Sequence, residues 1–241
     1  MWHEVGPLLA RAGHRVFALD LPPFGYSERR GPYTMAHWLG LLAGFERRLH
    51  VVRPVLVGHS LGAGVAAAAG LAHPHEVAGV VLLDGDALAF GGSHGWLADL
   101  LVYPYSTAVY RLATGSDWLV GRVFRDAWGP HPPAVDHAVL AEFERPFRVR
   151  GTQAALEQLL AAGVPGLTLA QLARLAGLVP RAVIWGANDT VDSVASGRTT
   201  AAALRTPLRL VADAGHLSML AQPRATAARI LRFVAETDRA S

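Results

Sequence analysis

The stretch from residue 54 to residue 75 contains no formally charged side chain, and it limits the possible folds more than any other part of the sequence. It is long enough to raise the question of a transmembrane helix. However, Pro54, Gly58, Ser60 and Gly62 divide it into a short apolar strand, a tight turn and an alanine-rich helix. The stretch therefore predicts a buried strand–turn–helix unit, and we expect no membrane span.

The same alternation of short apolar runs and helical segments continues through much of the chain. Strands are predicted at residues 15–19, 54–57, 77–83, 181–185 and 208–211. Helices are predicted at residues 3–12, 34–50, 61–72, 194–204 and 224–236. This order predicts an α/β fold in which a doubly wound, mostly parallel sheet carries helices on both faces.

The strand pattern stops between residues 91 and 176. No strong strand candidate occurs there, and the segment is rich in aromatic side chains, among them Trp96, Trp118 and Trp128. Such residues most often form the private core of a helical insertion, and a few of them can line an apolar ligand pocket. We therefore predict an α/β core made of residues 1–90 and 177–241, and a helical insertion made of residues 91–176.

The composition excludes several classes of protein. Cysteine is absent from the 241 residues, which rules out disulfides, thiolate metal sites and cysteine nucleophiles. The 22 basic residues are all arginine, are spread along the chain, and leave a net charge of only +3 against 19 acidic residues. Proteins that bind nucleic acid gather positive charge on one face, so we expect no nucleic-acid partner. The sequence leaves the oligomeric state open.

The N-terminus and the histidines argue against export and against metal binding. Glu4 stands where an export signal carries positive charge, and Pro7 and Arg11 interrupt the apolar run. We therefore expect a cytoplasmic protein. The 11 histidines show no HExxH or other paired metal spacing, so neither a metal nor another cofactor is expected.

A GxSxG sequence, Gly58-His59-Ser60-Leu61-Gly62, lies between a predicted strand and a predicted helix. A serine on such a turn needs small neighbours two residues before and two residues after it, because the backbone is strained and the flanking chain passes close by. The turn would hold the hydroxyl at the N-terminus of the helix, where the Leu61 amide can donate to an oxyanion. The flanking elements favour a nucleophilic serine over a glycine-flanked turn with an idle serine. We expect His59 to pack or to form a hydrogen bond nearby.

A serine nucleophile needs a base, and His216 is the candidate. It follows a predicted strand, and Gly215 would permit the sharp turn that brings the imidazole above the sheet. The base needs a carboxylate that fixes its tautomer, and Asp189 is placed for this role just past the C-terminal end of another predicted strand. Three other aspartates remain alternative partners: Asp84, Asp192 and Asp213.

The order Ser60, Asp189, His216, together with the GHSLG, GAND and AGH turns and the DLPPFGYS loop, resembles the pattern of the α/β hydrolase family over most of the chain outside the insertion. The resemblance implies an α/β hydrolase core made of residues 1–90 and 177–241, with a triad at the C-terminal ends of its strands. It further implies that the insertion at residues 91–176 is a helical cap over the pocket. It also implies that Ser60 is the nucleophile, that Asp189 orients the base His216, and that the Leu61 amide is one oxyanion donor.

The beginning of the chain departs from the family pattern, so we expect an N-terminally incomplete α/β hydrolase fold. Family members typically have about three strands and an HG-containing loop before the helix that residues 3–12 resemble, and this loop supplies the second oxyanion donor. The missing third strand would lie between residues 15–19 and 54–57, leaving these strands about 10 Å rather than about 5 Å apart. We expect their edges either to pair directly or to stay open, and Met1 to be an internal start or the start of a fragment.

These motifs predict a serine hydrolase that cleaves a small, fairly apolar ester or related acyl compound through an acyl-enzyme. The same triad also suits carbon–carbon bond hydrolysis, haloperoxidase-like perhydrolysis or a lyase reaction, because a fold does not set the reaction. Serine at position 60 disfavours dehalogenases and epoxide hydrolases, which use an aspartate nucleophile. A further hypothesis is a catalytically impaired truncated homologue or a ligand-binding pseudoenzyme.

Overall fold

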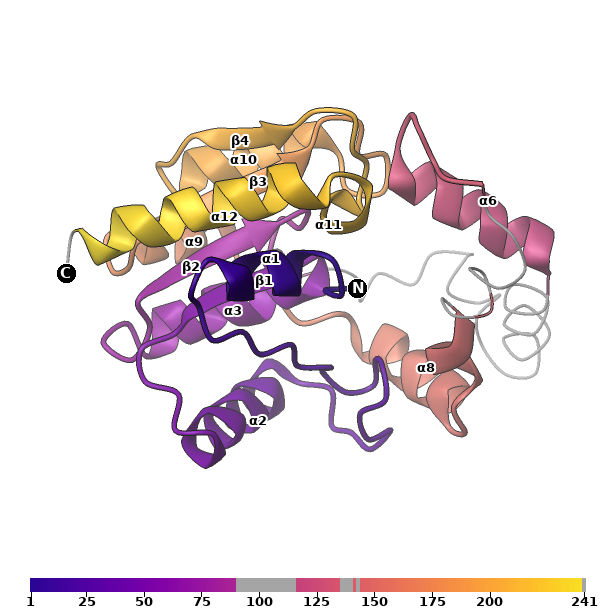
Figure 1. The fold of residues 1–241 in the computed structure, drawn as a ribbon. Helices are drawn as coiled ribbons and strands as arrows, with labels where there is room; N and C mark the ends of the chain where they lie inside the picture. Colours follow the sequence, from indigo (N-terminus) through magenta and orange to yellow (C-terminus); the bar gives the residue numbers. More distant parts are fainter. Residues whose placement is uncertain (90–115, 135–140, 142–143, 240–241) are drawn as a thin grey trace.

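The computed structural model describes residues 1–89, 116–134, 141 and 144–239. Within these residues, four strands form one parallel sheet in the order β1-β2-β3-β4 (Figure 1). The strands are Val55–His59 (β1), Gly79–Leu83 (β2), Arg181–Gly186 (β3) and Leu208–Val211 (β4). The predicted α/β fold with a parallel sheet is therefore confirmed.

Helices surround this sheet. Those of the core segments are Val5–Arg11 (α1), Met35–Arg48 (α2), Leu61–Ala72 (α3), Val194–Ala203 (α10), Ser218–Ala221 (α11) and Pro223–Asp238 (α12). Those within the predicted insertion are Asp117–Trp128 (α6), the 3-10 helix Arg145–Arg148 (η1), Thr152–Ala162 (α8) and Leu169–Leu175 (α9). Across the described parts of the chain, no helix has both the length and the apolar character needed to cross a membrane.

The helices cover both faces of the sheet, because the side chains of a strand point alternately to its two faces. Val80 and Leu82 of β2 belong to a core shared with α3, α9 and α10. Val81 and Leu83 belong to a second core, shared with α1, α6 and α12. All five residues of β2 are buried, as is typical of a strand in the interior of a parallel sheet.

The segment at residues 15–19 forms no strand, so that part of the prediction is wrong. Val16 and Phe17 are 38% and 41% exposed, and β1 pairs with β2 alone in the described sheet. An apolar run becomes a strand only where another backbone edge lies about 4.8 Å away, and residues 15–19 pair with no strand among the described residues. Of the two outcomes expected for these edges, the structure shows the open one.

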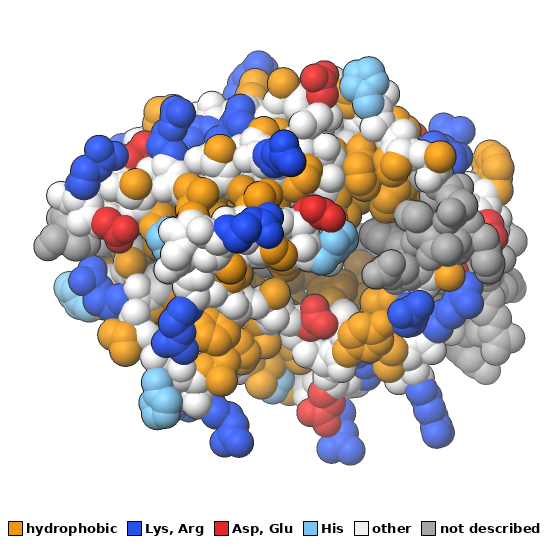
Figure 2. Space-filling model, viewed as in Figure 1, with side chains coloured by type: hydrophobic (Ala, Val, Ile, Leu, Met, Phe, Trp, Pro, Cys, Tyr) orange, Lys and Arg blue, Asp and Glu red, His pale blue; other side chains and the backbone are white. Residues whose placement is uncertain are grey.

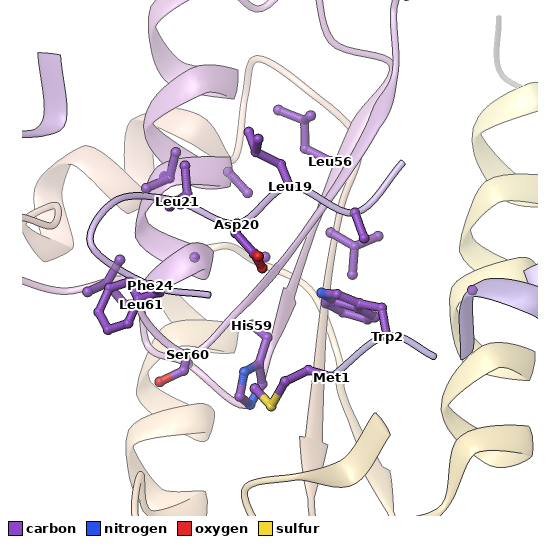
Figure 3. Close-up of a pocket in the computed structure, with 18 of the residues that line it drawn as sticks. Met1, Trp2, Leu19, Asp20, Leu21, Phe24, Leu56, His59, Ser60 and Leu61 are labelled. Atoms are coloured by element: carbon purple, nitrogen blue, oxygen red, sulfur yellow. The ribbon is translucent and has the colours of Figure 1, made fainter. Parts of the chain in front are cut away.

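A cavity of about 2880 Å³ lies along this open edge and extends to Ser60. Residues 14–21 and the whole of β1 contribute to its lining. Figure 2 shows a hollow with apolar side chains on this face of the molecule, and Figure 3 shows Leu19 and Leu56 among the residues that line the cavity. The cavity places apolar surface next to the predicted nucleophile.

The predicted insertion is described only in part. Trp96 lies outside the described residues, whereas Trp118 is on α6 and 68% exposed, and Trp128 packs against the second core. The Arg29 side chain links the loop after residue 20 to this region: its Nε donates to Thr152 Oγ1 (3.0 Å), and Nη2 donates to the Pro146 carbonyl (3.0 Å). The division into a core and a cap remains a prediction.

Candidate active site

Ser60 occupies a tight turn between β1 and α3, with φ 52° and ψ −123°. A positive φ is uncommon for a residue other than glycine, and it persists only where the surroundings hold it. The Ser60 amide donates to the Leu83 carbonyl at 3.0 Å, which ties the turn to the end of β2. Gly85 packs beneath it so closely that a Cβ there would lie 2.7 Å from the Ser60 Cα.

The two glycines of the motif have different surroundings. A Cβ added at Gly58 would lie 2.6 Å from the Ala63 amide nitrogen and closer still to the Gly62 carbonyl. A Cβ added at Gly62 would meet nothing within 4 Å. These contacts therefore support the expected need for a small residue two positions before Ser60, and they give no such support for the position two residues after it.

The structure brings Ser60, His216 and Asp189 together at the C-terminal ends of the strands. The distance between His216 Nε2 and Ser60 Oγ is 3.1 Å, and that between His216 Nδ1 and Asp189 Oδ2 is 2.9 Å. The other carboxylate oxygen of Asp189 accepts hydrogen bonds from the amides of Val191 (2.9 Å) and Asp192 (3.0 Å). The Asp189 side chain is fully buried, so its orientation is fixed by these contacts.

The hydrogen bonds assign the tautomer of His216. An ionised carboxylate only accepts, so Nδ1 carries the proton toward Asp189 and Nε2 is free to accept the Ser60 hydroxyl proton. Burial alone would lower the pKa of His216. The hydrogen bond and charge of Asp189, with the charges of Asp84 and Asp192, outweigh burial and raise it. The surroundings therefore favour the imidazolium that forms when the histidine takes a proton.

The loop that carries His216 is also held by α6. The Gly215 amide donates to the Trp128 carbonyl (2.8 Å), and the Leu217 amide donates to the Ala127 carbonyl (2.9 Å). A Cβ at Gly215 would lie 2.6 Å from the Ala127 carbonyl oxygen. The backbone of Gly215 does not have the positive φ that a glycine-only turn would show. The reason for glycine at this position is therefore the close approach of α6.

His59 supports the same loop from the other side. Its ring lies 5.0 Å from the His216 ring, and its Nε2 donates to the His216 carbonyl (2.8 Å). Burial, together with the charge of His216, lowers the pKa of His59 to about 3. His59 is therefore neutral near pH 7, and the hydrogen bond expected for this residue is present.

Two of the three alternative aspartates form other hydrogen bonds, and the third is exposed. Asp84 accepts hydrogen bonds from Gly186 and Ser218. Asp192 accepts from the Asp86 amide (3.0 Å), and Asp213 is exposed. None of these contacts reaches the His216 ring, so the geometry favours Asp189 as its partner.

The Leu61 amide, predicted to bind an oxyanion, lies at the N-terminal end of α3. Leu61 is the first residue of α3, where amides have no carbonyl partner within the helix. Figure 3 shows Phe24 and Leu61 near Ser60, so apolar groups lie close to the hydroxyl. No cluster of three or more candidate metal ligands occurs within the described ranges.

Fold and site together define a hydrolase built on a parallel sheet with a serine turn. The family profile of the alpha/beta hydrolase fold matches residues 1–223, and the chain belongs to this family. It is therefore an enzyme of the hydrolase type. Within the family it is similar to the uncharacterised hydrolase YugF of Bacillus subtilis, with 27% identity over 97% of this chain and 84% of that protein.

Other similarities are more local or concern the fold alone. The chain is similar to the 2-hydroxymuconate semialdehyde hydrolase of a Pseudomonas species, with 35% identity over 96 residues. This segment covers 39% of this chain and 34% of that protein. Among solved structures, bromoperoxidase from Bacillus anthracis superimposes with a TM-score of 0.76 at 16% identity, covering 97% of this chain and 86% of that chain. A meta-cleavage product hydrolase superimposes with a TM-score of 0.74 at 20% identity, covering 98% and 84%.

Proposed function

We propose that this hydrolase cleaves a small, fairly apolar ester or related acyl compound through an acyl-enzyme on Ser60. The observation that carries the proposal is the unbroken chain of contacts from Ser60 Oγ to His216 Nε2 (3.1 Å) and from His216 Nδ1 to Asp189 Oδ2 (2.9 Å). A serine hydroxyl becomes nucleophilic when a base within hydrogen-bond reach takes its proton. Both links here are within that reach.

In the proposed mechanism, Ser60 Oγ attacks the substrate carbonyl while His216 Nε2 takes the hydroxyl proton. Asp189 stabilises the resulting imidazolium, and the Leu61 amide donates to the oxyanion of the tetrahedral intermediate. His216 then gives its proton to the leaving alcohol as the intermediate collapses to the acyl-enzyme. A water molecule, activated by the same base, releases the acid and restores Ser60.

The walls of the cavity that contains Ser60 support an apolar substrate. Phe24, Phe124, Phe147 and Val164 contribute to the cavity that contains the hydroxyl. Burial of apolar substrate surface contributes roughly 25 cal/mol per Å², so such walls favour an acyl or alkyl group over a charged one. This apolar lining is the reason for proposing a fairly apolar substrate.

A fluorophosphonate probe tests the nucleophile directly. The folded protein should form one adduct, on Ser60, as shown by mass spectrometry of the labelled peptide. Ser60→Ala should abolish the adduct, whereas Ser196→Ala, which removes another serine of the same cavity, should be labelled like the wild type. A folded wild-type protein without an adduct on Ser60 would contradict the proposal.

Carbon–carbon bond hydrolysis is the second candidate, and the local similarity to a 2-hydroxymuconate semialdehyde hydrolase favours it. The two reactions separate by substrate. A p-nitrophenyl ester of a short acid and 2-hydroxymuconate semialdehyde should be compared by kcat/KM on the same preparation, with Ser60→Ala as the blank. Faster turnover of the ester supports the proposed function, and faster turnover of the semialdehyde supports the second candidate.

A further inference from the structure

Asp84 is a buried carboxylate just after β2, and the mechanism above gives it no task. It has no exposed surface, and its φ of 47° lies in the left-handed region. Burying a carboxylate is costly unless hydrogen bonds compensate, and a positive φ adds strain at a residue other than glycine. The cost of burial and the backbone strain at Asp84 must both be compensated by specific contacts.

The contacts of Asp84 join the two segments that carry Asp189 and His216. Its Oδ1 accepts from the Gly186 amide at 2.7 Å, at the end of β3 and three residues before Asp189. Its Oδ2 accepts from the Ser218 amide (3.3 Å) and from the Ser218 hydroxyl, two residues after His216. One side chain therefore fixes the spacing of the segments between which the 2.9 Å His216–Asp189 hydrogen bond forms.

The charge of Asp84 also acts on His216. Asp189, Asp84 and Asp192 all raise the pKa of the histidine, while burial lowers it. His59, which packs against the His216 ring, is neutral near pH 7 and adds no charge there. Burial raises the pKa of Asp84 itself to about 7, against the opposing hydrogen bonds from Ser218 and Gly186, and the charge of Asp189 raises it further.

We propose that Asp84 is a positioning residue of this enzyme: its carboxylate ties the end of β3 to the start of α11, sets the His216–Asp189 hydrogen bond, and stabilises the imidazolium. This inference rests on the proposed role of Ser60 and His216. Asp84 touches neither substrate nor reacting atoms in this mechanism, and it acts through the two residues whose loops it joins.

The test compares Asp84→Asn with Asp213→Asn. Asparagine tolerates a positive φ and keeps the shape of aspartate, so the first change removes the charge and the acceptor for Ser218 with little other disturbance. Asp213 also has a positive φ, of 54°, but it is exposed, which makes its substitution a matched control. The readouts are the rate of fluorophosphonate labelling as a function of pH, and kcat and KM for an ester.

We expect Asp84→Asn to slow labelling and to lower kcat by roughly tenfold to a hundredfold, with KM unchanged. The labelling rate rises with pH as His216 loses its proton. Removing a charge that raises the His216 pKa must therefore move this rise to lower pH. A merely structural role would reduce the folded fraction without moving the rise. Asp213→Asn should match the wild type in both readouts.

Ser218→Ala gives a second test that keeps the carboxylate. Losing the hydroxyl donor makes Asp84 easier to protonate, so the rise in labelling should again move to lower pH, with a smaller loss of rate. The inference is overturned if folded Asp84→Asn is labelled at the same rate as Asp213→Asn at every pH. It is also overturned if Asp84→Asn does not fold and Ser218→Ala leaves the pH dependence of labelling unchanged. A wild-type protein that is not labelled at Ser60 overturns the proposed function instead, and the two failures are thereby distinguished.

Discussion

The two glycines of the GxSxG turn should respond in opposite ways to alanine. At Gly58 a Cβ must move from 2.6 Å to about 3.4 Å from the Ala63 amide nitrogen, and the Gly62 carbonyl lies closer still, so the two backbone segments must open by at least about 0.8 Å. Neither neighbour is a flexible side chain, so the turn that holds Ser60 must itself move. A misplacement near 1 Å costs about a hundredfold in rate, and overpacking of this kind destabilises by roughly 1–3 kcal/mol. We expect Gly58→Ala to lose about a hundredfold in kcat/KM.

Gly62→Ala is the matched control, because it makes the same chemical change in the same motif. Its Cβ would enter open space at the start of α3, and alanine is favoured over glycine in a helix by roughly 0.5–1 kcal/mol. The variant should keep its ester kcat/KM within about threefold of the wild type and should melt at the same or a slightly higher temperature. Fluorophosphonate labelling, ester kinetics and thermal denaturation measure these effects. Equal damage from both substitutions, or full activity in Gly58→Ala, would refute the reasoning.

Three further predictions concern stability. His59 has an ordinary pKa of 6.5 in the unfolded chain but a pKa of about 3 in the folded protein, so the wild type should lose stability as pH falls between these values. His59→Asn should make the free energy of unfolding, measured by urea denaturation, depend less on pH over this range. For Asp84 the sign is reversed: its pKa rises from 3.8 to about 7 on folding, so the wild type loses stability as pH rises between these values. The stability of Asp84→Asn relative to the wild type should therefore increase over the same pH range. Arg29→Ala should lower the free energy of unfolding by about 1–3 kcal/mol and speed proteolysis near η1, because the Thr152 hydroxyl and the Pro146 carbonyl each lose a hydrogen-bond donor. Arg29→Lys lacks the fork of donors and should not restore this stability.

Much of the fold could be predicted because local patterns determine it. The predicted strands at residues 54–57, 77–83, 181–185 and 208–211 all overlap strands of the sheet. The reason is clearest for β2 and β3, because a parallel strand buried on both faces leaves a nearly continuous apolar run in the sequence. Residues 15–19 carry the same kind of run and form no strand. The two cases differ in whether a second strand lies beside the apolar run, and the local sequence does not contain this information.

The candidate site divides in the same way. The sequence order and the strand ends were enough to select Ser60, Asp189 and His216, which the structure places within hydrogen-bond distance of one another. The role of Asp84 was not visible, because its partners lie 102 and 134 residues further along the chain. A signal was present nonetheless: an aspartate directly after a run of buried apolar residues is expensive unless long-range donors satisfy it.

The contacts of the His216 loop explain why so few residues suffice for the proposed chemistry. The loop is held on one side by α6, through the Gly215 and Leu217 amides, on another by the His59 imidazole, and beneath by the Asp84 carboxylate. A base held in this way needs no rearrangement when it takes a proton, and electrostatic catalysis depends on such preorganisation. Because α6 lies in the predicted insertion, the segment expected to cover the substrate also positions the base. Changes in that segment should therefore alter turnover as well as substrate choice.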